Sequence, residues 1–196
     1  MEIIKTIETE NGKKIEIFAS PDGSNPRQYD NLAKMVCFHE RYILGDEHNY
    51  SSGDYSSFEE MKKDIIKRDG AVIVEPLYMY EHGGITISTT PFSCPWDSGQ
   101  LGFVIVTKDG IKNNFGVKRV TKKLIEKSKE ILQSEVEEYK MYLEGDVYGF
   151  RCYDKDGNIT DSCTGFFGTD FEKNGMLCHI SDEDIVATLK EEGSVF

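Results

Sequence analysis

The chain has 196 residues, of which 38% are apolar and 30% are charged, and its formal net charge is −12. This composition is typical of a soluble globular protein and excludes long disordered chains and fibrous repeats. No apolar run approaches the roughly 18–20 residues that a membrane helix needs. The first residues lack the basic region and apolar segment of a secretory signal, so we expect a cytoplasmic protein. The acidic balance argues against direct nucleic-acid binding, which relies on Lys and Arg contacts with phosphates.

Acidic groups are concentrated near the end of the sequence. From Asp154 to Phe196 there are ten carboxylates and three lysines, a balance of −7. Such a segment can be a solvated surface that aids solubility, or an acidic face that docks on a basic partner. The five cysteines are odd in number and show no C-x-x-C spacing. They therefore favour reduced thiols over a disulfide framework.

In chain order, the first expected elements are two short strands over 2–8 and 14–19, both rich in β-branched residues. Asn11-Gly12 lies between them and predicts a type I′ hairpin turn, because both residues tolerate positive φ. After a loop rich in Pro, Gly, Asn and Asp, residues 32–44 are compatible with either a strand or a helix.

A helix is expected over 58–68. Ser57 can cap its N-terminus, and Glu60 follows three residues later, which is the spacing of a capping box. The apolar residues expected on its buried face are Phe58, Met61, Ile65 and Ile66.

Three strands follow, over 71–80, 85–89 and 101–107. Pro76 places an edge or a bulge in the first of them, because proline cannot donate to a ladder. Gly83-Gly84 turns the chain into the second strand. Residues 90–100 form a loop with two prolines and the only tryptophan, and Asp109-Gly110 ends the third strand.

A long helix over about 120–143 is the clearest prediction, because apolar residues recur along it with helical spacing. Thr121 can cap this helix and Gly145 can end it. The remaining predicted elements are a hairpin over 147–153 and 158–163 and a short helix after Ser181. Turn-linked strands without regular βαβ alternation favour an α+β fold of mostly antiparallel sheet, with shorter helices beside the long one. We expect a single domain over 1–196, in which the acidic residues from about 154 could form a small subregion.

Familiar catalytic motifs are absent from the sequence. There is no P-loop, no strand-linked G-x-G-x-x-G, no H-E-x-x-H and no G-x-S-x-G. His39 and His48 could supply two imidazoles to a metal, but their separation matches no familiar spacing. The third ligand would have to be His82 or His179, from a distant segment. In the alternative, His39 is packed and hydrogen-bonded, and His48 lies on a loop.

The loop around Trp96 carries the second candidate site. Cys94 could act as a nucleophile with His82 as base and Asp97 as orienting group. Alternatively, the flat Trp96 ring and the polar side chains of Asp97, Ser98 and Gln100 form a binding surface. A third reading is a structural loop whose tryptophan caps the core.

A further candidate combines Arg41 and Tyr42 with Trp96. Arginine offers a fork for phosphate, and the rings offer stacking faces, as an anionic aromatic ligand such as a nucleotide requires. Lys118-Arg119 could add a second positive site. In the alternative, Arg41 pairs with one of the many carboxylates.

Three stretches carry a resemblance to a known family: NPRQYDNLAKMVCFHERYILGDEH at 25–48, TISTTPFSCPWDSGQLGFVIVTKDGI at 86–111, and EVEEYKMYLEGDVYGFRCYD with DSCTGFFG at 135–154 and 161–168. They resemble a group of small acidic proteins carried by bacteriophages and conjugative elements of Gram-positive bacteria. The resemblance implies an accessory gene of a mobile element, a kind of gene that often counters host defence. It implies no catalytic residue.

The sequence therefore predicts a non-enzymatic phage or mobile-element protein that inhibits a host defence component or sequesters a nucleotide-like signal. Its expected binding residues are His39, Arg41, Tyr42, His82, Trp96, Asp97, Ser98 and Gln100. We expect no cofactor, metal or membrane partner, and homo-oligomerisation stays open. The alternatives are a small enzyme using Cys94 or a His-based metal site, and a structural or assembly component of the element.

Overall fold

The computed structural model describes residues 2–20, 23–193 and 195. It has an α+β fold with two antiparallel sheets, which confirms the predicted class. The chain divides into two compact units, one made of Met1–Asn25 with Met141–Phe196 and the other of Pro26–Lys140. The sequence predicted one domain with an acidic C-terminal subregion. It could not show this division, because the terminal unit is assembled from both ends of the chain.

The terminal unit contains a sheet of strands β1 (Ile3–Glu8), β2 (Lys14–Ala19), β7 (Val147–Tyr153) and β8 (Ile159–Phe167), in that order. Both predicted hairpins are present, and β2 pairs with β7 to join them. The predicted type I′ turn is wrong. Positive φ occurs only at glycines among the described residues, so Gly12 (φ 78°) has it and Asn11 does not. The Gly12 N–H donates to the Thr9 carbonyl, so the hairpin has a three-residue loop over 10–12 instead of a two-residue one. Glycine occupies the left-handed position of this loop.

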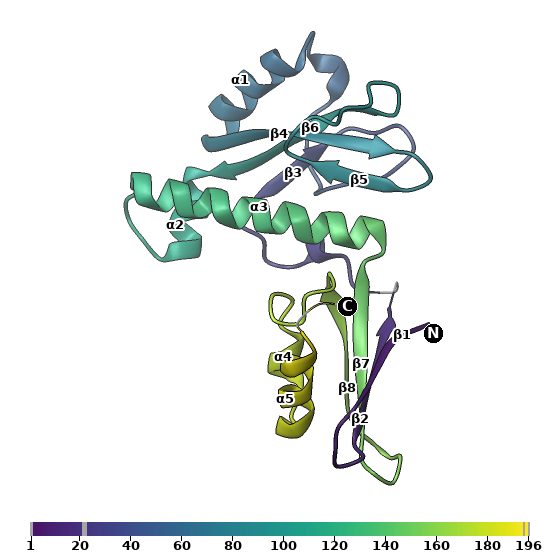
Figure 1. The fold of residues 1–196 in the computed structure, drawn as a ribbon. Helices are drawn as coiled ribbons and strands as arrows, with labels where there is room; N and C mark the ends of the chain where they lie inside the picture. Colours follow the sequence, from purple (N-terminus) through teal and green to yellow (C-terminus); the bar gives the residue numbers. More distant parts are fainter. Residues whose placement is uncertain (1, 21–22, 194, 196) are drawn as a thin grey trace. The chain divides into compact units, whose positions relative to one another are not determined.

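One face of this sheet is covered by α4 (Met176–His179) and α5 (Glu183–Glu192), as Figure 1 shows. Alternate residues of the strands meet the apolar side of these helices, as a half-buried sheet requires. The core contains Ile15, Ile17, Phe150, Phe166, Phe171, Met176, Ile185 and Leu189. The N-terminus of α5 is capped by the side chain of Asp182, one residue after the predicted Ser181.

The second unit contains a sheet with the order β3 (Lys34–Cys37), β6 (Ser98–Thr107), β4 (Ala71–Glu81) and β5 (Ile85–Ser88). The ambiguous segment 32–44 therefore holds a strand of four residues followed by a loop. The β6 strand starts three residues earlier than predicted, so Ser98 and Gln100 belong to it and not to the preceding loop. Pro76 lies where β5 no longer pairs with β4 and beside a register shift, as predicted.

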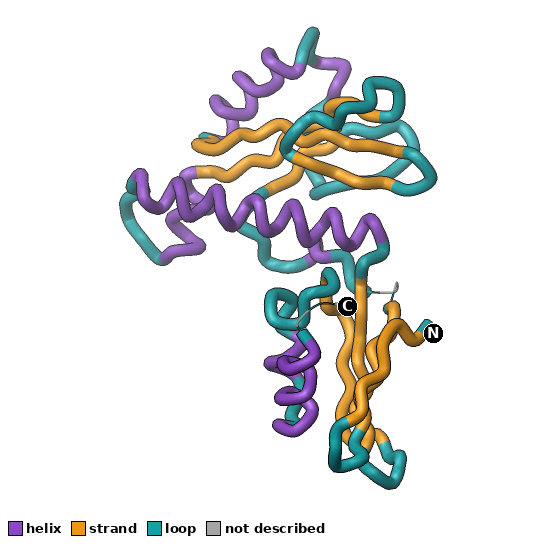
Figure 2. Tube along the Cα trace, viewed as in Figure 1, coloured by secondary structure: helices purple, strands orange, loops and turns teal. Residues whose placement is uncertain are grey.

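Helices α1 (Phe58–Asp69) and α3 (Lys122–Glu144) lie on opposite faces of this second sheet, as the part of α3 up to Lys140 shows in Figure 2. The Ser57 hydroxyl caps α1 by accepting from the Glu60 N–H, at 3.2 Å. The Glu60 carboxylate reaches back to Ser56 instead of Ser57. Met61 and Ile65 are buried as predicted, but Ile66 is 45% exposed because it lies beyond the apolar stripe.

The β6 strand ends at Thr107, as predicted, but Asp109-Gly110 after it is not a simple strand end. These two residues lie in the first turn of a short helix, α2 (Lys108–Phe115), which the sequence did not predict. Its cap is Thr107, whose hydroxyl accepts from the Gly110 N–H at 2.9 Å. The glycine that suggested a turn is thus accommodated in a helix because the cap and the burial of Ile111 stabilise it.

The predicted long helix is α3, and Thr121 and Gly145 lie at its ends as expected. It is anchored by a buried ion-pair network. The Arg27 guanidinium contacts both oxygens of Asp46 at 2.6 and 3.1 Å, and lies 3.6 Å from Glu135 on α3. Glu135 also accepts the N–H groups of residues 32 and 33. In the described part of the chain, no helix has the length and apolar character needed to cross a membrane.

Candidate partner-binding site

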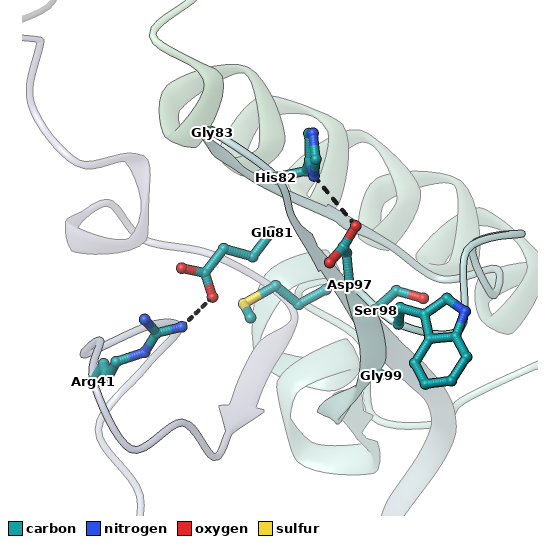
Figure 3. Close-up of a pocket in the computed structure, with 9 residues that line it drawn as sticks. Arg41, Glu81, His82, Gly83, Asp97, Ser98 and Gly99 are labelled. Atoms are coloured by element: carbon teal, nitrogen blue, oxygen red, sulfur yellow. Dashed lines mark hydrogen bonds and ion pairs between the residues drawn. The ribbon is translucent and has the colours of Figure 1, made fainter.

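Three segments of the second unit converge on one surface pocket. Arg41 lies in the loop after β3, Glu81 and His82 lie at the end of β4, and Trp96 and Asp97 immediately precede β6. The antiparallel β4–β6 ladder brings the last two segments together, and the Glu81 N–H donates to the Asp97 carbonyl at 2.8 Å. The pocket is open, encloses about 550 Å³ and is shown in Figure 3. Its lining comprises Arg41, Met79, Glu81, His82, Gly83, Trp96, Asp97, Ser98 and Gly99.

Glu81 holds the loop after β3 against the sheet. Its Oε2 lies 2.5 Å from Arg41 Nη2, and its Oε1 accepts from the Tyr42 hydroxyl at 2.9 Å. The hydrogen bond to Glu81 raises the pKa of the Tyr42 hydroxyl. His39 Nδ1 accepts the N–H groups of Arg41 and Tyr42, and its ring stacks on the Tyr42 ring. Arg41 therefore has a carboxylate partner, which was the alternative to an anion site.

Asp97 lies between His82 and Cys94. Its Oδ2 accepts from His82 Nδ1 at 3.2 Å and from the Cys94 thiol at 3.7 Å. Among the described residues no hydrogen bond joins Cys94 to His82. A nucleophile–base–orienting series needs the imidazole next to the sulfur, whereas here the carboxylate occupies the middle position. Cys94, His82 and Asp97 are thus brought together as predicted. However, His82 is not hydrogen-bonded to the Cys94 thiol and cannot accept its proton in this arrangement.

Trp96 does not cap the core. Its side chain is 92% exposed, so the structural-loop interpretation is wrong on this point. Ile43, two residues after Arg41, is fully exposed, and Tyr42 is partly so. Arg41 and Trp96 line the pocket, whereas Tyr42 and Ile43 follow Arg41 in the chain and do not line it. Exposed apolar patches are a frequent feature of interaction sites, unlike single exposed residues. We call Arg41, Tyr42, Ile43 and Trp96 the Trp96 surface.

The other predicted site residues lie at varying distances from this pocket. Ser98 lines it, and its hydroxyl donates to the Cys94 carbonyl. His39 lines a neighbouring pocket of about 620 Å³ that also includes Arg41. Gln100 lies further along β6, where its amide donates to the Gly102 carbonyl. Lys118 and Arg119 are exposed between α2 and α3 and line neither pocket.

Sequence reasoning missed Glu81 and Ile43. The available signal for Glu81 was an acidic residue at the end of an apolar strand, directly before the predicted hairpin turn. Ile43 carried no comparable signal, because an isoleucine in an apolar segment is ordinarily buried.

The metal hypothesis finds no supporting geometry. Across residues 2–20, 23–193 and 195, no three His, Cys, Asp or Glu side chains are grouped so that they could hold a metal ion. His48 Nε2 lies 2.9 Å from the Cys37 carbonyl, and its Nδ1 accepts the Tyr50 N–H. His48 is thus held by the backbone at the end of β3 and by the backbone of its own loop.

Charge is distributed unequally between the two units. The terminal unit has 17 carboxylates against 7 Lys and Arg, a formal charge of −10, and the second unit has 18 against 16, a formal charge of −2. Several acids in the C-terminal quarter have lysine partners. Lys13 pairs with Asp182 and Asp184, and Lys5 pairs with Glu192. Part of the acidity is therefore neutralised within the fold.

The fold and the pocket together define an α+β protein of two antiparallel sheets, with an exposed tryptophan at a surface pocket of the second unit. Comparisons of the chain with protein-family models, with curated proteins and with solved structures found no match.

Proposed function

We propose that this chain is a non-enzymatic binding protein that docks on a partner protein through the Trp96 surface. The observation that carries the proposal is the 92% exposure of the only tryptophan at the edge of a pocket. Leaving a tryptophan in water forfeits a large burial energy. At about 25 cal/mol per Å² and 150–250 Å² per ring, its full burial would contribute about 4–6 kcal/mol before association costs.

The composition of the surface supports a protein partner. Trp, Tyr and Arg are the residues most enriched among those that dominate binding energy at protein interfaces. The Trp96 surface contains one of each, together with exposed Ile43. The Arg41 loop is held by Glu81, so part of this surface is ordered before binding, which lowers the entropic cost of association.

The resemblance to small acidic proteins of bacteriophages and conjugative elements supports a bacterial host protein as the partner. A small accessory protein of a bacteriophage or conjugative element acts inside a bacterial host, and we propose that it inhibits a host defence protein there. Sequestration of a nucleotide-like signal has less support, because Arg41 is paired and Asp97 adds a negative charge to the pocket.

The test begins with capture of the tagged protein from infected or defence-proficient bacteria. Bound proteins are identified by mass analysis, and the partner is then purified and titrated. Trp96→Ala should weaken binding to the purified partner at least tenfold. Ile66→Ala is the matched control, because Ile66 is an exposed apolar residue on α1, outside the pocket.

Three results would contradict the proposal. If Trp96→Ala binds the purified partner as tightly as the parent chain, the Trp96 surface is not the docking site. Binding that survives Trp96→Ala but falls steeply with added salt would point instead to the acidic terminal unit. A nucleotide that co-purifies with the parent chain and is lost from Trp96→Ala would replace the protein partner by a small ligand.

A further inference from the structure

The Asp97 carboxylate is held in place through one of its two oxygens, and the other oxygen is unoccupied by the described residues. Its Oδ2 is held by His82 and Cys94, whereas Oδ1 has no hydrogen-bond partner among the residues that the structure describes. In Figure 3 one oxygen of Asp97 is turned toward His82 and the other is turned away from it. The side chain is 38% exposed and lines the pocket. An oriented acceptor is therefore available to a molecule that enters.

The formal charge of the pocket is negative. Arg41 carries the only positive charge among the described residues that line the pocket. Its guanidinium pairs with the Glu81 carboxylate, which also accepts from the Tyr42 hydroxyl. With His82 counted as neutral, Asp97 leaves one negative charge without a counter-ion. An anionic group in this pocket would meet that charge, whereas a cationic group would compensate it.

The Trp96 ring provides the second half of the site. It lines the same pocket, and its face is open to solvent. Tryptophan is the best aromatic partner for a cation, and guanidinium is the cation most often found over it. A guanidinium can stack on a ring while its edge donates to a carboxylate, which a compact ammonium does less well.

We infer that this pocket accepts a basic side chain of the partner protein, an arginine, stacked on Trp96 and donating to Asp97. The inference rests on the proposed function and names the chemistry of the partner at that surface. It reverses the charge that the sequence suggested for a ligand of Arg41, Tyr42 and Trp96. The reversal arises because the pocket holds two carboxylates, Glu81 and Asp97, and only Glu81 is paired with the Arg41 guanidinium.

The test is an NMR titration of the ¹⁵N-labelled chain at constant ionic strength. The probe is the capped peptide acetyl-Gly-Arg-Gly-amide, and the comparison probes are its citrulline analogue, which keeps the shape without the charge, and adenosine monophosphate. The readouts are the Trp96 indole signal and the amide signals of Gly83, Ser98 and Gly99. Asp97→Asn is compared with Asp30→Asn, which removes the same charge from an exposed residue outside the pocket.

The arginine peptide should shift the pocket signals and bind at least fivefold more tightly than the citrulline peptide. Asp97→Asn should lose about fivefold in affinity, and Asp30→Asn should bind as the parent does. The inference is overturned if tens of millimolar arginine peptide moves no pocket signal, if citrulline binds equally, or if the monophosphate binds more tightly. A further outcome separates the two proposals. If Trp96→Ala weakens binding of the purified partner, but Asp97→Asn does not and the arginine peptide shifts no pocket signal, the docking proposal stands and the arginine inference fails.

Discussion

The Arg41 guanidinium and the Glu81 carboxylate lie 2.5 Å apart although 40 positions separate them in the chain. The contact joins the loop after β3 to the end of β4, and it sets the Arg41 side of the pocket. The Arg41 side chain is 66% exposed, so the ion pair contributes little to global stability. Its role is to position the loop that carries Tyr42 and Ile43.

Arg41→Ala should therefore leave the thermal unfolding midpoint nearly unchanged and loosen the loop. Hydrogen exchange in peptides covering residues 38–44 should accelerate, and binding of the purified partner should weaken. Arg68→Ala is the control, because Arg68 forms an exposed pair with Asp64 within α1. Faster exchange of 38–44 in both variants, or in neither, would contradict the positioning role.

Unlike Arg41, Arg27 should contribute strongly to the free energy of unfolding. Its side chain is 3% exposed and faces Asp46 and Glu135, so Arg27→Met would leave two largely buried carboxylates, 18% and 11% exposed, without their cation. Removing one partner of a buried ion pair typically costs about 3–5 kcal/mol. Urea unfolding followed by far-UV circular dichroism measures this loss. Arg27→Lys, which keeps the charge without the planar fork, should lose less. Equal stability of Arg27→Met and the parent would show that the network is not stabilising.

Two glycines of β6 offer a matched pair of substitutions. A Cβ added at Gly102 would lie 1.9 Å from the Val36 carbonyl oxygen, whereas one at Gly99 would meet nothing within 4 Å. Gly102→Ala must separate β3 from β6 and should cost at least about 2 kcal/mol. Gly99→Ala should be close to neutral in the same urea experiment. A smaller loss for Gly102→Ala than for Gly99→Ala would contradict the close approach of the two strands.

The terminal unit should lose stability in acid. The hydrogen bond from Lys13, with one from Asn11, lowers the pKa of Asp184 below its ordinary value of 3.8. When folding lowers the pKa of a carboxyl group, that group stabilises the fold at pH values above its pKa in the unfolded chain. This stabilisation is lost as the pH falls through its pKa in the folded chain. Asp184→Asn should therefore lower the thermal midpoint at neutral pH, and the difference should vanish in strong acid.

Glu183→Gln is the control for that pH series. It removes a charge from the same turn of α5 but not the one that contacts Lys13. Its effect should be smaller and less dependent on pH. An Asp184→Asn difference that persists below the ordinary carboxyl range would mean that the Lys13 contact is not its cause.

The five cysteines are free thiols and should react in a defined order. Burial raises the pKa of both Cys37 and Cys152 to about 12, so these two should resist alkylation until the chain unfolds. Exposed Cys178 should react first. Cys94 should react no faster than Cys178, because its thiol contacts a carboxylate and not an imidazole. Preferential labelling of Cys94, read by peptide mass analysis, would instead support an enzyme that uses this thiol.

The local elements of this protein could be predicted from the amino-acid sequence. Apolar spacing and end caps located α1 and α3, and turn residues between β-branched runs located the hairpins. These features depend on neighbouring residues, so they are readable along the chain. The α2 helix was missed because Gly110 resembles a turn residue until Thr107 is seen to cap a helix.

The way in which these elements combine became visible in the folded chain alone. The pairing of β2 with β7 and the meeting of Arg41, Glu81 and Asp97 depend on long-range register and burial, which local propensity does not specify. The same holds for Trp96, whose apolar ring alone would suggest the core. Its exposure follows from the path of the loop before β6, and it excludes the alternative in which Trp96 caps the core.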